Sequence, residues 1–413
     1  MTLRPRLWVA TELYFPEETS TGYFLTRIAE GLAGDYDVRV ISGRPAYSER
    51  HLRVSAREAR AGTRIYRMPA TRFDKDRLGR RLINLLSFSL SAFCFALARI
   101  QKGDLVLVVT TPPSLPVVMC LAAKLKRGRL LLLMHDVFPE ALAATGILKK
   151  SSAAYRLLAR LFRVVYRRFE RIIVLGRDAQ DIVAQKTGMT AARLPVIPNW
   201  GDTEEIFPLP RQQNPFRSAH GLDGKIIIQF SGNIGRTHDV ETLLEVAQRL
   251  QSDPRFHFLF VGAGGKAGSV RAEIARRSLA NVTLLPRQPR DRLNQMLNAS
   301  DATLIGFIDE MYGLSVPSRM YNVMAAGVPI LALAHPRSEL ALVVTENQAG
   351  WALSNATQLY EVILGLGEAN GLADAQARGD RGRAAVERHY TLAAALQLFR
   401  QVLGEVPGEL KLD

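Results

Sequence analysis

The sequence predicts an α/β protein built from two doubly wound, Rossmann-like domains. Short apolar runs alternate with longer helical stretches, this alternation occurs twice, and a proline-rich stretch without periodicity separates the two series. At 413 residues the chain is too long for one ordinary core and suits two or three domains of about 150 residues each. Each series therefore predicts a parallel sheet covered by helices.

The apolar runs of four or five residues predict ten buried parallel strands, five in each half of the chain. In the first half they are residues 7–10, 38–41, 105–109, 130–134 and 172–175, with helices at 23–32 and 114–126. In the second half they are residues 226–230, 258–261, 282–285, 302–305 and 330–333, with helices at 240–250, 269–278, 290–298 and 318–326.

The domain boundaries follow from the same pattern. Three prolines and no periodicity mark residues 199–215 as a hinge-like linker. We expect one domain over 1–198, a second over 216–388, and a terminal helix within 389–413 that returns toward the first domain.

The composition excludes several classes of protein. With 47% hydrophobic and 23% charged residues the chain is globular rather than disordered. Its two cysteines can build neither a disulfide framework nor a zinc site, which favours a reducing compartment. Residues 1–15 have no long apolar stretch and no small-residue cleavage site, so they predict a buried first strand and no signal peptide.

The positive charge is confined to the N-terminal half. Residues 1–200 hold 33 Lys and Arg against 16 Asp and Glu, whereas residues 201–413 hold 21 against 23. Such a basic half indicates an anionic partner: nucleic acid, acidic lipid or a phosphorylated substrate. The signatures of nucleic-acid readers are missing, so we expect no nucleic-acid partner.

Two segments of this basic half are candidates for membrane contact. Residues 82–98 carry no charge, but several serines and an asparagine favour a surface-lying or core helix over a membrane span. Residues 155–171 interleave six arginines with apolar side chains, a pattern typical of helices that bind anionic lipid. The alternative is an ordinary Rossmann helix with solvated arginines.

Two apparent motifs carry no chemistry of their own. The run Gly262–Gly268 follows a predicted strand, but its glycine spacing fits neither a dinucleotide fingerprint nor a Walker A loop, so we interpret it as a turn that lies near a nucleotide in another way. The seven histidines show no metal-ligand spacing. We therefore expect no metal site and no cofactor.

In the N-terminal half, two candidate sites follow predicted strands, where open α/β sheets bind ligands. The loop 14–22 ends in Gly22 before a helix and offers backbone N–H groups to a phosphate, unless it is an ordinary turn. His135 and Asp136 follow the strand 130–134 and are placed for sugar-hydroxyl contacts or proton handling. A structural histidine is the alternative.

In the C-terminal half, two loops precede predicted helices. Gly232 and Asn233 lie in a glycine-containing loop, and Arg236 can neutralise phosphate charge there. Ser318 and Arg319 begin the helix 318–326, which predicts a diphosphate site at a positive helix end. One turn further, Asn322 is placed to hydrogen-bond ribose hydroxyls.

These segments resemble glycosyltransferase family 4, in particular the bacterial branch that builds capsule, colanic acid and O-antigen saccharides. The resemblance is carried by Pro-Asn-Trp at 198–200, Ser-Gly-Asn-Ile-Gly at 231–235 and Val-Pro-Ser-Arg-Met-Tyr-Asn-Val-Met-Ala-Ala-Gly-Val-Pro at 316–329. It implies a GT-B fold, two Rossmann-like domains facing across a cleft, with the acceptor on the first domain and the nucleotide on the second. It also implies retention of anomeric configuration without a metal.

The resemblance also implies roles for individual residues. Gly22 would lie near the diphosphate and His135 would contact the donor sugar. Residues 286–288 would border the base. The residues near the phosphates would be Asn233, Arg236, Ser318 and Arg319. The family's two glutamates, eight residues apart, fall here on Leu314 and Asn322, and its phosphate-site lysine is missing near 237–239.

The sequence therefore predicts a retaining glycosyltransferase, with His135, Arg236 and Arg319 as catalytic residues and Gly22, Asp136, Gly232, Asn233, Ser318 and Asn322 as substrate-binding residues. We expect a UDP-sugar donor, a polyprenyl-diphosphate-linked acceptor, and a cytoplasmic protein held on the inner face of the membrane by its basic half. A sugar-nucleotide epimerase of the same architecture and a non-catalytic sugar-nucleotide-binding protein are the alternatives.

Overall fold

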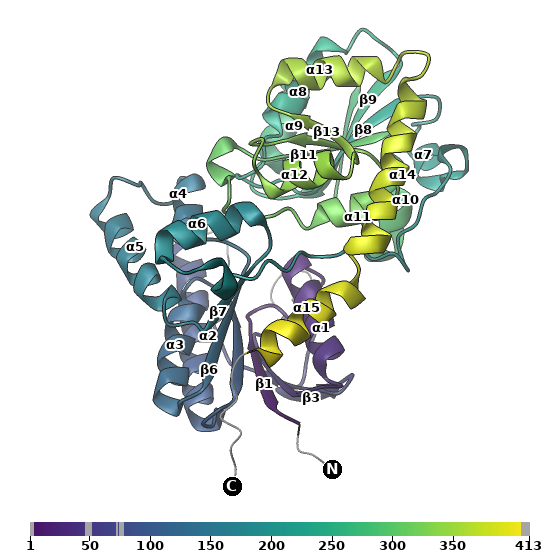
Figure 1. Cartoon of the computed structure of the whole chain (residues 1–413). Coiled ribbons are helices and arrows are strands. Elements are labelled where there is room, and N and C mark those ends of the chain that lie inside the picture. The colour runs from purple at the N-terminus through teal and green to yellow at the C-terminus, as the bar shows by residue number, and fades with distance from the viewer. Residues whose placement is uncertain (1–3, 46–51, 72, 74–77, 406–413) are drawn as a thin grey trace. The chain divides into compact units, whose positions relative to one another are not determined.

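The computed structural model describes residues 4–45, 52–71, 73 and 78–405, which divide into two compact units (Figure 1). One unit runs up to Pro198 and includes the chain again from Ala395, and the other is Asn199–Ala394. Each contains one sheet with helices packed against it, which confirms the predicted fold class of two Rossmann-like domains.

The sheet of the N-terminal unit has seven strands in the order β3-β4-β2-β1-β5-β6-β7, and all neighbours are parallel except β3 and β4. All five predicted strands are present, and the β3–β4 hairpin at the sheet edge is additional. The strands are β1 (Arg6–Ala10), β2 (Asp37–Ser42), β3 (Arg57–Arg60), β4 (Thr63–Arg67), β5 (Leu105–Val109), β6 (Arg129–Met134) and β7 (Arg171–Val174).

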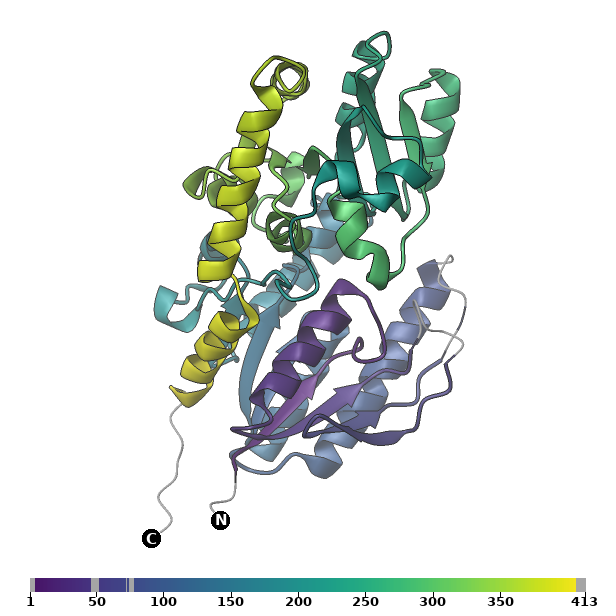
Figure 2. The ribbon, with the colours of Figure 1, turned by 90° about the vertical axis from the view of Figure 1, so that its right-hand side faces the viewer.

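Helices lie on both faces of this sheet (Figure 2). They are α1 (Ser20–Leu32), α2 (Leu78–Arg99), α3 (Ser114–Lys126), α4 (Glu140–Ala144), α5 (Ala153–Tyr166) and α6 (Arg177–Thr187), with a 3₁₀ turn at Ala191–Arg193. The basic helix expected over 155–171 ends at Tyr166, because the chain turns at the buried Phe169 and enters β7. The terminal helix α15 (Leu392–Gly404) packs on α1, where Arg400 forms an ion pair with Asp35.

The sheet of the C-terminal unit is wholly parallel, in the order β10-β9-β8-β11-β12-β13. Its strands are β8 (Ile226–Asn233), β9 (Phe256–Ala263), β10 (Val282–Leu285), β11 (Ala302–Gly306), β12 (Ile330–Leu333) and β13 (Gly350–Leu353). This is the dinucleotide-fold order 3-2-1-4-5-6, whose connections reverse direction between β8 and β11. Open sheets bind ligands at the carboxyl ends of the strands at such a point.

The helices of this unit complete its two faces. They are α7 (Pro215–Ala219), α8 (Glu241–Arg249), α9 (Ala267–Arg276), α10 (Leu293–Leu297), α11 (Arg319–Ala325), α12 (Glu339–Glu346), α13 (Ala356–Gly365) and α14 (Gly371–His389). Short 3₁₀ turns occur at Arg211–Gln213, Arg290–Arg292 and Asp309–Met311. Aromatic and aliphatic side chains from β8, β9, α8 and α13 contribute to its hydrophobic core.

The segment expected to be a linker, 199–215, is part of the C-terminal unit. Arg383 of α14 donates hydrogen bonds to the carbonyl oxygens of Ile206 (2.6 Å) and Ala325 (2.7 Å), which ties the segment to the end of α11. The Gly201 N–H donates to the Tyr390 carbonyl oxygen at 3.0 Å. The segment 199–215 is therefore joined both to the chain at the end of α14 and to α11.

Within the described residues, one helix is long and apolar enough to cross a membrane, by length and composition only. It is Leu82–Arg99 of α2, and 28% of that stretch is buried. One face of α2 packs in the N-terminal unit, where Phe95 contacts the rings of Trp8 and Tyr66. The other face exposes a row of large apolar side chains, Leu82, Ile83, Leu86 and Leu90.

Gly379 of α14 provides a test of the packing that holds α11. A Cβ atom there would lie 1.9 Å from the Gly327 carbonyl oxygen, so the two backbones are in contact. We expect Gly379→Ala to lower the free energy of unfolding by about 2 kcal/mol through overpacking, although alanine is the better helix former. Urea denaturation measures this. Gly268→Ala in α9, where a Cβ atom would meet nothing within 4 Å, is the control and should not destabilise the protein.

Candidate active site

The ends of β8 and β9 and the loops that follow them meet at the carboxyl edge of the C-terminal sheet. A Cβ atom on Gly262 in β9 would lie 1.9 Å from the carbonyl oxygen of Gly232, its partner in β8, and one on Gly264 after β9 would lie 2.5 Å from the Ile234 carbonyl oxygen. Gly262 and Gly264 have positive φ angles, +152° and +154°. The glycines therefore let the two backbone segments pack directly on each other.

Arg319 lies beside the first of these loops, where its guanidinium carbon is 4.5 Å from the centre of the Phe230 ring. Its Nη1 donates to the Ser231 carbonyl oxygen at 2.9 Å. A Cβ atom on Gly232 would come within 3.1 Å of Nη1, which explains why the smallest residue is there. Burial lowers the pKa of Arg319 to about 10, so the side chain is still charged at neutral pH.

Two nitrogens of this buried cation lack partners. Nε and Nη2 of Arg319 are inaccessible to solvent and have no hydrogen-bond partner among the residues that the structure describes. A buried charge is strongly unfavourable unless it is paired. These two unsatisfied nitrogens on a buried cation next to Gly232 mark a candidate site for an anion with several oxygen acceptors, such as a phosphate.

His238 and Lys266, which the sequence reasoning did not single out, complete the surroundings of Arg319. The His238 ring stacks on Phe307, and burial followed by the charges of Arg319 and Lys266 lowers its pKa to about 3. It is therefore neutral at physiological pH. Lys266 donates to the His238 carbonyl oxygen at 2.8 Å and to Glu241 at 2.9 Å. Its ammonium group thus reaches the segment 237–239, where the family's lysine is missing.

The other predicted residues of this unit are distributed over the same edge. Asn233 and Arg236 are exposed in the loop after β8, and Ser318 immediately precedes α11. The Asn322 side-chain oxygen accepts the Asp202 N–H at 3.2 Å, so in this structure it ties the segment 199–215 to α11. Leu314, at the other glutamate position, is a buried packing residue.

The remaining predicted residues belong to the N-terminal unit, at the carboxyl edge of its own sheet. The backbone N–H groups of His135 and Asp136 both donate to the Thr110 hydroxyl, at 3.1 and 3.2 Å. The Nε2 atom of His135 is buried without a partner among the described residues, and burial lowers its pKa to about 4. The Gly22 N–H donates to the Thr19 side chain at 3.2 Å, as part of the cap of α1.

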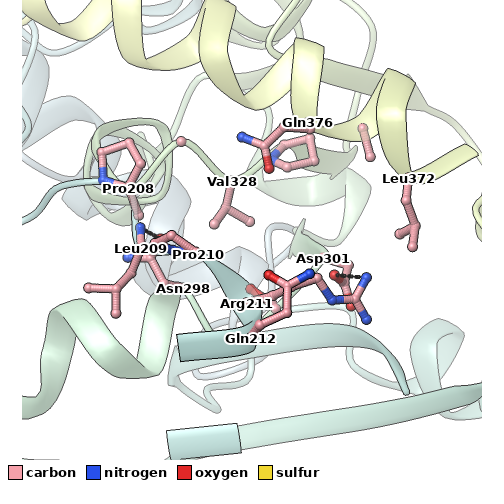
Figure 3. Close-up of a pocket in the computed structure, with 15 residues that line it drawn as sticks. Pro208, Leu209, Pro210, Arg211, Gln212, Asn298, Asp301, Val328, Leu372 and Gln376 are labelled. Atoms are coloured by element: carbon pink, nitrogen blue, oxygen red, sulfur yellow. Dashed lines mark hydrogen bonds and ion pairs between the residues drawn. The ribbon is translucent and has the colours of Figure 1, made fainter. Parts of the chain in front are cut away.

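A cavity of about 470 Å³ lies at the opposite, amino edge of the C-terminal sheet (Figure 3). Its charged side chains are paired with each other, since Arg211 and Asp301 form an ion pair of 3.1 Å. It contains none of the predicted site residues. Within the described part of the chain, no group of three His, Cys, Asp or Glu side chains could hold a metal ion.

Two Rossmann-like units, each with a mainly parallel sheet between helices, are the architecture of the GT-B glycosyltransferases. Residues 21–200 match the glycosyl transferase 4-like domain, and residues 212–366 match glycosyl transferases group 1. The chain belongs to glycosyltransferase family 4, as its motifs indicated.

Three known proteins illustrate the similarity. A probable glycosyltransferase of Pseudomonas aeruginosa, WbjE, is 30% identical over 98% of this chain and 100% of its own length. The putative colanic acid biosynthesis glycosyl transferase WcaI of Escherichia coli K12 is 28% identical over 79% of this chain and 83% of its own. The crystal structure of Anabaena HepE in complex with UDP-glucose superposes with a TM-score of 0.72 at 16% identity, covering 97% of this chain and 100% of that one, and shows the shared fold.

The burial of His135 predicts a pH-dependent stability. Because its pKa falls from 6.5 to about 4 on folding, the unfolded chain takes up a proton first as the pH drops. The contribution of this group to the free energy of unfolding is fully present above about pH 6.5. It is lost as the pH falls toward 4, which lowers the free energy of unfolding by about 3 kcal/mol at most. Urea denaturation between pH 7 and 4.5 should show a shallower decline for His135→Gln. His389→Gln, at an exposed position, should decline like the native protein.

Proposed function

We propose that this glycosyltransferase moves a hexose or N-acetylhexosamine from a UDP-sugar to a polyprenyl-diphosphate-linked saccharide, with retention of anomeric configuration. The observation that carries the proposal is the buried Arg319 guanidinium next to Gly232 at the end of β8, with two nitrogens that have no partner among the residues described. A role in the synthesis of cell-envelope polysaccharide is supported by the name of the similar protein WcaI.

The donor diphosphate fits this site because its charge and its oxygen acceptors complement Arg319. Arg236 is exposed in the adjoining loop, and the Lys266 ammonium group donates a hydrogen bond to the His238 carbonyl oxygen. A neutral His238 adds no further charge to the site. The similar fold of Anabaena HepE carries UDP-glucose in its crystal structure, which supports a uridine nucleotide.

The proposed chemistry needs electrostatic stabilisation of a leaving group rather than a carboxylate nucleophile. As the bond between sugar and diphosphate lengthens, positive charge develops on the sugar and negative charge on the departing phosphate. Arg319 and Arg236 would stabilise that phosphate, a contribution typically worth a few kcal/mol of transition-state energy. The acceptor hydroxyl would attack from the same face and give its proton to the leaving phosphate, without a metal ion.

His135 is proposed to contact the donor sugar as a neutral group. With a pKa of about 4 its ring carries no charge at neutral pH, so it can exchange hydrogen bonds with hydroxyls but does not repel a developing cation. Its unpartnered Nε2 is the atom available for that contact. Asp136 and Gly22 are proposed to border the same substrate.

The acceptor and the cellular location are proposed from the surface of the N-terminal unit. Large apolar side chains are exposed on three helices of this unit: Leu82, Ile83, Leu86 and Leu90 on α2, Leu121 and Leu125 on α3, and Leu157, Leu161 and Val164 on α5. Arg156, Arg160 and Arg163 are exposed on α5 as well. Apolar insertion combined with positive charge is how peripheral proteins bind anionic membranes, which supports a place on the inner face of the cell membrane.

Arg319 is the residue with which to test the donor site. We expect Arg319→Ala to lower kcat by about a hundredfold and to weaken UDP binding, because a preorganised charge on the leaving group is lost. Calorimetry with UDP and a transfer assay with UDP-sugars and a lipid-linked acceptor, each with and without EDTA, measure both effects.

The control is Arg276→Ala, which removes an exposed arginine of α9 paired with Glu273. It should leave binding and turnover unchanged. Native turnover in folded Arg319→Ala would rule out the leaving-group role, and loss of activity in EDTA would rule out metal-free transfer. A crystal soaked with UDP in which the Arg319 pocket stays empty would refute the donor site itself.

The arginines of α5 test the membrane surface. We expect the triple substitution of Arg156, Arg160 and Arg163 by Gln to weaken binding to vesicles with acidic lipid about a hundredfold, since each basic residue near such a surface contributes about 1 kcal/mol. Vesicle co-sedimentation measures the binding. A triple control replaces exposed arginines of the C-terminal unit, Arg271, Arg276 and Arg388. Equal losses in both triple variants would contradict a membrane role for α5.

A further inference from the structure

A groove of about 580 Å³ runs between the β3–β4 hairpin and α2 of the N-terminal unit. Its wall is mainly apolar and aromatic, from Tyr66, Met68, Pro69, Leu90 and Phe95, and the exposed thiol of Cys94 lies in it. Volumes of this size are typical of sites for small organic ligands. The groove is separate from every predicted site residue.

The groove is continuous with the exposed apolar row of α2. Leu90 lines the groove and is 63% exposed, and Leu86 and Leu82 precede it by about one and two helical turns. A hydrocarbon chain could therefore lie along α2 and enter the groove without crossing a polar barrier at Leu90. Exposed leucines in such a row are unfavourable in water unless something covers them.

One end of the groove is cationic and leads toward the ligand-binding edge of the sheet. Arg57, which is exposed, and Arg67 line it; the Arg67 side chain is wholly buried and forms an ion pair of 2.6 Å with Glu58, but its Nε has no partner in the part of the chain that the structure describes. The Nη2 of Arg67 donates to the Phe15 carbonyl oxygen at 3.0 Å, in the loop that leads to Gly22. Met68 and Pro69 follow the carboxyl end of β4, the edge at which parallel sheets bind ligands.

We propose that this groove binds the hydrocarbon chain of the lipid-linked acceptor, with its phosphate end toward Arg57 and Arg67. This inference rests on the proposed function. The occupant is an anionic isoprenoid because the groove combines an apolar wall, an adjoining apolar row, the exposed Arg57 and the unsatisfied Nε of Arg67. A second copy of the chain would bring the same arginines together and is disfavoured by their repulsion.

Cys94 allows the proposal to be tested by binding alone. Cys120 is buried, so a maleimide should label Cys94 in the native protein, and Cys94→Ala gives the background. We expect farnesyl phosphate, below its critical micelle concentration, to slow labelling at least about fivefold, farnesol to slow it less, and inorganic phosphate not to slow it. Unchanged labelling with farnesyl phosphate would overturn the proposal, as would labelling that is slow at high protein concentration and fast on dilution, which indicates a second copy.

Two exposed leucines provide matched variants. Leu90→Glu places a charge in the groove and should abolish the protection of Cys94, whereas Leu121→Glu, on α3 outside the groove and 51% exposed, should leave it intact. In the transfer assay Leu90→Glu should raise KM for the lipid-linked acceptor about tenfold, with KM for the donor unchanged, because a carboxylate is poorly solvated against an alkyl chain. Equal effects of both variants would contradict a specific groove.

Different results would refute the groove and the proposed function. If the native enzyme transfers sugar to a lipid-linked acceptor while Leu90→Glu behaves like the native protein, the groove is excluded and the proposed function stands. If no lipid-linked acceptor is used although farnesyl phosphate protects Cys94, the acceptor in the proposed function is wrong and the groove binds another anionic isoprenoid.

Discussion

The C-terminal unit is organised around a positive charge that it does not neutralise. Arg319 lies over the Phe230 ring and donates one hydrogen bond to Ser231, while two of its nitrogens have no partner among the described residues. Such an arrangement costs stability and is retained only if the surroundings enforce it. They do so through backbone contacts: Gly232 leaves room for the guanidinium, and Gly262 packs on Gly232. The phosphate proposed to bind there would remove this cost by supplying acceptors for the unpaired nitrogens.

The regular parts of the fold could be predicted because buried parallel strands are short apolar runs. The β3–β4 hairpin could not, since its strands carry charges: β3 reads Arg-Glu-Ala-Arg, and β4 reads Thr-Arg-Ile-Tyr-Arg. An edge strand needs only one buried face, and pairing with β2 supplies the rest of its stability. The amphipathic pattern of α5 likewise continued past its end, because periodicity registers which residues are apolar and not where the backbone must turn to enter the next strand.

Within the candidate site, the sequence singled out residues that belong to one local motif, but not residues that contacts between different loops bring together. Arg319 and Gly232 were recognisable from their own segments. Lys266 and His238 were not, because their contact depends on the loop after β9 packing on the loop after β8, and no periodicity encodes which backbones touch. Asn322 shows the converse: its position on α11 was evident, but its hydrogen bond to Asp202 depends on the path of the chain between the units. The sequence thus indicated the candidate site residues more completely than the hydrogen bonds and packing contacts that hold them in place.

The position of α15 has a consequence for how the protein is made. This helix leaves the ribosome only after the whole C-terminal unit, yet it packs on α1, where the Leu396 side chain fills the space beside Gly31. The amino-terminal half therefore spends the time needed to synthesise nearly two hundred further residues with that apolar surface uncovered. Vectorial synthesis should leave it dependent on chaperones during that interval, and a polypeptide that stops before Leu392 should be more prone to aggregation than its well-formed sheet would suggest.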